Sequence, residues 1–129
     1  MSDPFTSREF KSDGNWTGPP EFAMYCPVKG ARMKFLNIPV KNAANGFPKT
    51  YYKALIIDAP GPVEAKPRIE SIIFLPKSET ELVATTCEAL HGMLMNETIV
   101  AVLDAQKNVT EVRHEFTFFN GQQGLWTCR

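Results

Sequence analysis

Hydrophobic and polar positions alternate along most of the chain, in short segments of the kind that form β-strands. Gly, Pro and Asn concentrate in residues 41–49 and 60–67, which are therefore predicted to be loops. The first and last of the predicted strands are short and optional. The alternation predicts strands over residues 21–28, 31–40, 50–59, 68–76, 98–106, 112–120 and 124–128.

One segment shows a different period. Ser78 precedes Glu81 by three residues, which is the spacing of a helix capping box. Apolar residues then recur at helical spacing as far as about Met95, so this segment is predicted to be an amphipathic helix whose apolar stripe packs in the core. The stripe consists of Leu82, Val83, Cys87, Leu90, Met93 and Leu94.

The predicted order is strand, strand, strand, helix, strand, strand, with extra edge strands at either end. The fold class is therefore mostly β with one helix (α+β), and the order matches an OB-like five-stranded barrel. A cystatin-like or other curved sheet with one helix is the main structural rival. Residues 1–20 lack periodicity and are predicted to be a flexible N-terminal arm, followed by a single OB-like domain over residues 21–129.

Composition and cysteine usage narrow the class of protein. A chain of 129 residues with 43% hydrophobic and 22% charged residues is typical of one globular domain. It contains no apolar run long enough to span a membrane and no secretory h-region. Cys26, Cys87 and Cys128 are odd in number and form no CxxC pair, so a disulfide framework is not expected and a cytoplasmic location is predicted (the host cytoplasm for a viral protein).

Three N-x-T sequons begin at Asn15, Asn96 and Asn108. Without a signal sequence they are interpreted as chance matches rather than glycosylation sites.

The charge distribution changes this picture most. The chain is neutral overall, yet residues 22–57 carry a net charge of +6 with no acidic residue, whereas residues 58–104 carry −5. Phenylalanine and tyrosine rings lie among the cations of the basic segment. Cations that follow phosphates and rings that stack on bases are typical of a groove for single-stranded nucleic acid.

Strand parity distributes these residues over two faces. Tyr51 and Lys53 share one face of their strand and Tyr52 lies on the other. In the strand over 31–40, Phe35 lies on the face opposite to that of Arg32. The predicted nucleic-acid-binding residues are Arg32, Lys34, Lys41, Phe47, Lys49, Tyr51, Tyr52 and Lys53. The structural alternative is a solvated cationic face whose aromatic residues belong to the core. For Phe35 and one of the two tyrosines, a place in the core is predicted.

Part of the chain also resembles a known family. The sequence Ile72-Ile73-Phe74-Leu75-Pro76-Lys77-Ser78, with an acidic amphipathic helix expected from Glu79, is similar to single-stranded-DNA-binding proteins of bacteriophages, which have OB-folds. The resemblance covers residues 51–90 and implies a role in viral or phage DNA replication or recombination. The chain departs from the family at its end, Trp126-Thr127-Cys128-Arg129, where many members carry an acidic tail.

Motifs of catalysis are missing from the sequence. It contains no GxGxxG, Walker, HExxH or GxSxG motif, and His91 and His114 are not at metal-ligand spacing with any cysteine. No catalytic residue, metal site or cofactor is therefore predicted, and the protein is not expected to be an enzyme.

The sequence therefore predicts a protein that binds single-stranded DNA with little sequence preference, as a homo-oligomer or in cooperative arrays. The alternative is a protein-interaction module, such as a viral accessory or inhibitor protein, whose basic patch binds an acidic partner surface. A third reading, a small-molecule pocket or enzyme on a curved sheet, requires a deep apolar cavity lined by His114 and Phe116.

Overall fold

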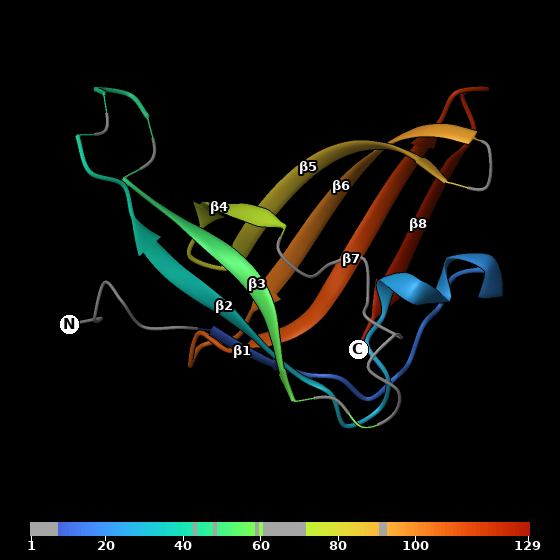
Figure 1. Ribbon diagram of the computed structural model, residues 1–129, viewed down its shortest axis with the longest axis horizontal. Helices are drawn as coiled ribbons and strands as arrows, with labels where there is room; N and C mark the ends of the chain where they lie inside the picture. Colours follow the sequence, from blue (N-terminus) through green and yellow to red (C-terminus); the bar gives the residue numbers. More distant parts are fainter. Residues whose placement is uncertain (1–7, 43, 48, 59, 61–71, 91–92) are drawn as a thin grey trace.

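One curled antiparallel sheet, shaped as a half-barrel, makes up most of the structure (Figure 1). The computed structural model describes residues 8–42, 44–47, 49–58, 60, 72–90 and 93–129, apart from the side chains of residues 88–90, 93 and 94. The elements are β1 (Arg8–Lys11), the 3₁₀ helix η1 (Pro20–Tyr25), β2 (Arg32–Pro39), β3 (Thr50–Asp58), β4 (Ile73–Ser78), β5 (Glu81–Leu90), β6 (Met93–Leu103), β7 (Val109–Phe118) and β8 (Gln123–Cys128).

Each strand pairs with the next along the chain, so the sheet order is β1 to β8 without a crossover. The segment after β1 continues along the far edge of the sheet. The backbone N–H of Asp13 donates to the carbonyl of Arg129 (2.9 Å), and that of Thr17 donates to the carbonyl of Thr127 (3.1 Å). The beginning of the described chain therefore covers the free edge of its last strand, which would otherwise expose unpaired backbone groups.

The inner face of the curl forms the core. Phe10, Met33, Phe35, Phe74 and Ile99 are all at most 1% exposed. They come from four strands, and each occupies the inward position of the period-2 alternation. This burial of large apolar side chains is the main force that holds the sheet in its curled form.

A second cluster, of aromatic residues, lies where η1 packs on the inner face of the last strands. Phe22 stacks on Trp126 with a ring-centroid distance of 5.5 Å and an interplanar angle of 23°. Gly124 is required here, because a Cβ at this position would lie 2.5 Å from the Trp126 ring. The aromatic rings therefore fix η1 against β8, and the ribbon of η1 lies beside β8 in Figure 1.

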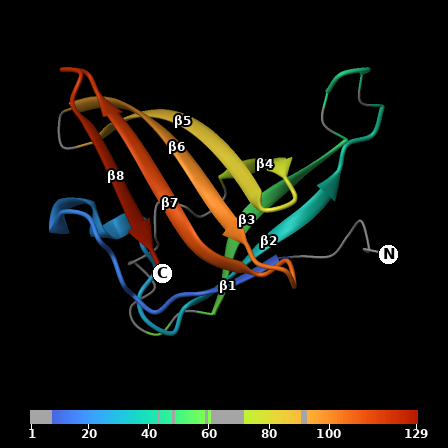
Figure 2. The ribbon, with the colours of Figure 1, turned by 180° about the vertical axis from the view of Figure 1, so that it is seen from behind.

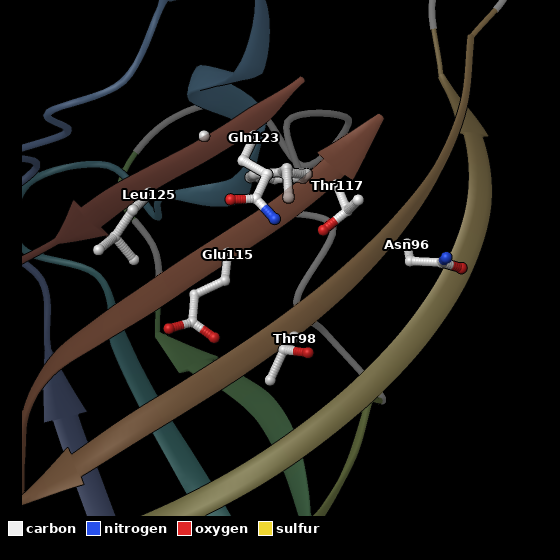
Figure 3. Close-up of a pocket in the computed structure, with 8 residues that line it drawn as sticks. Asn96, Thr98, Glu115, Thr117, Gln123 and Leu125 are labelled. Atoms are coloured by element: carbon white, nitrogen blue, oxygen red, sulfur yellow. The ribbon is translucent and has the colours of Figure 1, made fainter. Parts of the chain in front are cut away.

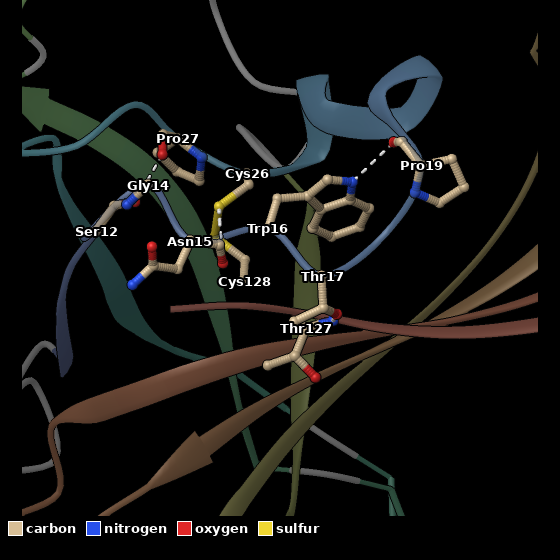
Figure 4. Close-up of a disulfide and its surroundings, with 10 residues drawn as sticks. All are labelled: Ser12, Gly14, Asn15, Trp16, Thr17, Pro19, Cys26, Pro27, Thr127 and Cys128. Atoms are coloured by element: carbon tan, nitrogen blue, oxygen red, sulfur yellow. Dashed lines mark hydrogen bonds between the residues drawn. A yellow bond between two sulfur atoms is a disulfide. The ribbon is translucent and has the colours of Figure 1, made fainter.

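A disulfide between Cys26 and Cys128 closes the structure beside this cluster (Figure 4). The expectation of three reduced cysteines is wrong. The two cysteines lie 102 residues apart in sequence, and they meet because the segment between β1 and η1 runs along β8. Cys87 is exposed and is a free thiol.

The predicted helix is wrong, and with it the OB-like arrangement of five strands and one helix. The segment forms β5 and part of β6, with Leu82 and Ala84 buried on the inner face and Thr85 exposed. Ser78 does use its hydroxyl as a cap would, but it accepts the N–H of Thr80 (3.2 Å) inside the turn from β4 to β5. The same local hydrogen-bonding chemistry therefore opens a hairpin instead of a helix.

Most of the other predicted strands are confirmed. The strands over 31–40, 50–59, 112–120 and 124–128 are confirmed as β2, β3, β7 and β8, with shifted ends. The strand predicted over 98–106 overlaps the longer β6, which begins earlier and ends at Leu103. Residues 21–28 hold η1 instead of a strand. β4 begins at Ile73, and residues 68–71, most of the predicted loop before them and His91 lie outside the described residues.

The first twenty residues were predicted to be a flexible arm. Within them, β1 pairs with β2 over the register Arg8↔Phe35 to Lys11↔Arg32, and Trp16 bridges to Cys128. Residues 8–17 are thus hydrogen-bonded to β2 through β1 and to the end of the chain through the segment that follows β1.

Candidate functional site

The outer face of the β2–β3 hairpin carries the residues singled out by the sequence. On this face Leu36 lies opposite Lys53, and Ile38 lies opposite Tyr51. Phe35, fully buried, and Tyr52, only 6% exposed, point to the core instead. The prediction that Phe35 and one tyrosine belong to the core is confirmed. Tyr52 is thereby removed from the candidate binding residues, because its ring is not available on this surface.

An apolar hollow of about 470 Å³ lies between the tip of this hairpin and β4. It forms because, in the described part of the chain, the pairing of β3 with β4 ends at Tyr52↔Phe74, before the tip of the hairpin. Towards the tip the two strands separate, and the hairpin projects beyond the rest of the sheet (Figure 1). We call this the hairpin hollow; its lining residues are Val40, Ala44, Phe47, Thr50, Tyr51, Ile73 and Leu75.

Large apolar side chains are exposed in the hairpin hollow. Phe47 is 67% exposed, and Ile73 and Leu75 are each 45% exposed. Single exposed apolar residues are common on proteins, but a group of them around one hollow is typical of a binding surface. The strand predicted over residues 68–76 was the available signal for Ile73 and Leu75, because both lie on one face of it, but the strand pattern does not say which face is exposed.

Lysines lie on the segments that border the hairpin hollow. Lys41 and Lys49 are exposed on the connecting loop, and Lys53 is half-buried on β3. The backbone N–H of Val40 donates to the carbonyl of Lys49 (2.9 Å), which holds the base of the loop. The structure therefore places Lys41, Phe47, Lys49, Tyr51 and Lys53 at one end of the hairpin.

Arg32 and Lys34 lie towards the other end. The Nε atom of Arg32 donates to Oε1 of Glu9 at 2.6 Å. This hydrogen bond lowers the pKa of Glu9 below its ordinary value of 4.5 and raises the pKa of Arg32. The carboxylate thus compensates the charge of Arg32, whereas Lys34 lies between Arg32 and the hollow. The eight predicted residues do not form one continuous cationic groove.

A buried ionisable pair lies on the inner face, away from the hairpin hollow. Nδ1 of His114 and Oε2 of Glu97 are 3.1 Å apart, and both side chains are at most 1% exposed. The rings of Trp16 and Tyr25 contact His114 edge-on, each with a centroid distance of 5.4 Å. His114 is therefore a hydrogen-bonded core residue.

The third reading required an apolar cavity at His114 and Phe116. The hollow bordered by Phe116 opens instead on the outer face of β6, β7 and β8, and it is lined by polar side chains that project from that face (Figure 3). These are mainly Asn96, Thr98, Glu115, Thr117 and Gln123, with Leu125 at the side. The structure therefore gives no support to a small-molecule pocket at His114.

The described part of the chain contains neither a candidate metal-binding cluster nor a candidate membrane-spanning helix. No group of three or more His, Cys, Asp or Glu side chains there is placed to hold a metal ion. No helix in that part is long and apolar enough to cross a membrane.

Comparison with known proteins supplies no family. No protein-family model matches the chain, and no similar curated protein or solved structure was found. The function therefore has to follow from the chemistry and shape of the protein's own surface.

Proposed function

We propose that this protein is a non-enzymatic interaction module that binds an acidic segment of a partner protein in the hairpin hollow. The observation that carries the proposal is the exposure of Phe47, Ile73 and Leu75 around one hollow, with Lys41, Lys49 and Lys53 on its bordering segments. A partner that supplies both apolar and carboxylate side chains would match both properties.

The apolar residues would supply most of the affinity. Burying a side chain such as Phe47 or Leu75 stabilises a complex by up to about 1.5–3 kcal/mol. The lysines would contribute specificity and a faster association rate, because their charges remain near solvent and attract a carboxylate before contact.

Binding of single-stranded DNA is the second candidate, favoured by the exposed ring of Phe47 beside Tyr51 and the lysines. Three observations favour a protein partner over DNA. Val40, Ile73 and Leu75 line the hollow but cannot stack on bases. Tyr52 is in the core. The disulfide is typical of an oxidising compartment, where replication and recombination of DNA do not take place.

A selection from a random peptide display library tests the proposal without a known partner. The folded protein is the bait, and a variant with Phe47→Ser and Leu75→Ser serves for counter-selection. We expect enriched peptides to contain both Asp or Glu and large apolar residues, and to bind the wild type at least about tenfold more tightly than the variant, a difference of about 1.4 kcal/mol. Enrichment of peptides that bind both proteins equally would reject the hairpin hollow as the site.

Fluorescence anisotropy with a labelled oligo-dT strand distinguishes the second candidate. Under the protein-partner proposal, any binding of oligo-dT is weak and unchanged by Phe47→Ser with Leu75→Ser. Tight binding that weakens steeply with salt and is lost in a Tyr51→Ala, Lys53→Ala variant would establish the nucleic-acid function instead.

A further inference from the structure

The three N-x-T sequons all begin at exposed residues. Asn15 precedes the strand-like segment beside β8, Asn96 lies on the outer face of β6, and Asn108 lies in the turn from β6 to β7. None of these three side-chain amides forms a hydrogen bond with the described residues. Each amide is thus directed to solvent, which is the placement that a glycosylated asparagine requires.

The disulfide reopens the interpretation of these sequons. They were interpreted as chance matches because the sequence shows no signal peptide, and a cytoplasmic location was predicted. The Cys26–Cys128 disulfide is instead typical of proteins that fold in the endoplasmic reticulum or another oxidising environment. Only seven asparagines occur in the chain, so three of seven begin a sequon, and all three have threonine at the third position.

We propose that Asn108 is an N-glycosylation site and that Asn15 and Asn96 are secondary acceptors. In the transfer, Nδ2 of the asparagine loses a proton and forms a bond with the anomeric carbon of an oligosaccharide. The bond between that carbon and the diphosphate of a lipid-linked donor breaks, and the lipid diphosphate leaves. The donor and the transferase belong to the secretory pathway of the cell that makes the protein.

Asn108 is ranked first because of its local geometry. Its backbone is fixed by two hydrogen bonds with Asp104, one from the Asn108 N–H to Oδ1 (3.0 Å) and one from the Asp104 N–H to the Asn108 carbonyl (2.9 Å). The preceding Lys107 has a positive φ of 67°, and this conformation completes the tight turn. A rigid turn that presents an unbonded amide accommodates a glycan without any change in the fold.

Asn15 and Asn96 are in more constrained positions. The carbonyl of Asn15 accepts the N–H of Arg129 (3.0 Å), and Asn96 lies in the middle of the sheet, opposite both Cys87 and Thr117. A glycan on Asn96 would extend over the polar hollow of Figure 3. The β6–β7 turn that carries Asn108 and the tip of the β2–β3 hairpin lie apart in both ribbon views (Figures 1 and 2), so the proposed glycan on Asn108 leaves the hairpin hollow open.

The test uses the full chain, expressed behind a cleavable secretion leader in cultured animal cells. Protein is recovered from both the medium and the cell lysate, so that retention in the cell does not remove the readout. Peptide-N-glycosidase treatment in ¹⁸O-water converts each glycosylated asparagine into a mass-labelled aspartate, which peptide mass spectrometry locates. We expect the label at Asn108 in the majority of molecules.

Three variants separate recognition of the sequon from effects on folding. Asn108→Gln removes the acceptor and leaves Thr110 in place, including the bond from its hydroxyl to the carbonyl of Val102 (3.3 Å). Thr110→Ser keeps both the hydroxyl and the sequon and should keep the label, whereas Thr110→Ala should lose it. An unlabelled Asn108 in wild-type protein that carries its disulfide would overturn the proposal, whether the chain is secreted or retained.

Discussion

The outer faces of two parts of the same sheet differ in their chemistry. On β6, β7 and β8 most outward side chains are polar, for example Thr98, Glu115 and Gln123, as expected for a sheet face in contact with water, although Leu125 on β8 is also exposed. On the hairpin and β4 the outward positions include Tyr51, Ile73 and Leu75.

Both faces cover the same kind of inner face, whose burial stabilises the fold. The largely polar face shows that most outward positions of the curled sheet can be occupied by polar residues. The apolar outer residues of the hairpin and β4 are therefore better explained by binding than by folding. This difference can be tested in four ways.

The largest effect is expected from two neighbours on β4. Phe74→Ala should lower the free energy of unfolding by about 3–5 kcal/mol, because Phe74 is fully buried and packs edge-on against Phe35. Leu75→Ser, on the outer face, should change it by less than about 0.5 kcal/mol. Urea denaturation followed by circular dichroism measures both. Comparable losses in the two variants would mean that the outer face also stabilises the fold.

A smaller loss is expected when the disulfide is removed. Cys26→Ser with Cys128→Ser should lower the free energy of unfolding by about 3 kcal/mol, because a long loop of the unfolded chain is no longer closed. Peptide binding at the hairpin hollow should be unchanged while the protein remains folded. Thiol titration of the denatured wild type should find one free thiol, from Cys87, and three after reduction. Three thiols before reduction would disprove the disulfide.

The third test adds the same negative charge to each of the two outer faces in turn. Leu75→Asp should weaken binding of a selected acidic peptide at least about tenfold, because it removes apolar contact and adds a like charge. Thr98→Asp places the same charge on the polar face and should leave binding unchanged. Fluorescence anisotropy with the labelled peptide measures both variants. Equal weakening would indicate a general charge effect and no particular site.

The smallest effect concerns Glu9. Glu9→Gln removes the partner of Arg32 and should strengthen binding of an acidic peptide by about twofold, within the range of an exposed ion pair. The pKa of Glu9 is lowered in the folded protein, so the small stabilisation from this pair is present above pH 4.5 and is lost as the pH falls through the lowered value. The affinity for the peptide, measured as a function of pH, should therefore become equal for the wild type and the variant only at acidic pH, where Glu9 is protonated. A constant difference would exclude Glu9 as its origin.

The sequence was sufficient for the hairpin that carries the site. Residues 31–40 and 50–59 alternate strongly around a loop with Asn45-Gly46, so their strands and faces could be predicted. The structure of residues 78–95 could not be predicted, because their apolar residues fit the spacing of a helix as well as that of two adjacent strands. Leu82, Val83 and Leu90 are examples. Only pairing with β4 and β7 decides between the two.

The composition of the site was predicted in part. Parity placed Tyr51 and Lys53 together, but it does not say which face of a strand becomes the inner one. Burial of Tyr52 and Phe74 on the inner face fixed that choice, and it brought Ile73 and Leu75 to the surface. The disulfide was missed because its cysteines meet only through the pairing of residues 13–17 with β8, a contact between the two ends of the chain.

The Cys26–Cys128 bond also determines how the protein responds to proteases. All the residues from Cys26 to Cys128 belong to one covalent ring, which contains the exposed loop between β2 and β3. A single cut in that loop therefore opens the ring without releasing a fragment. On a denaturing gel the nicked protein should run as one species of nearly full mass, and it should separate into two pieces only when a reductant breaks the bond.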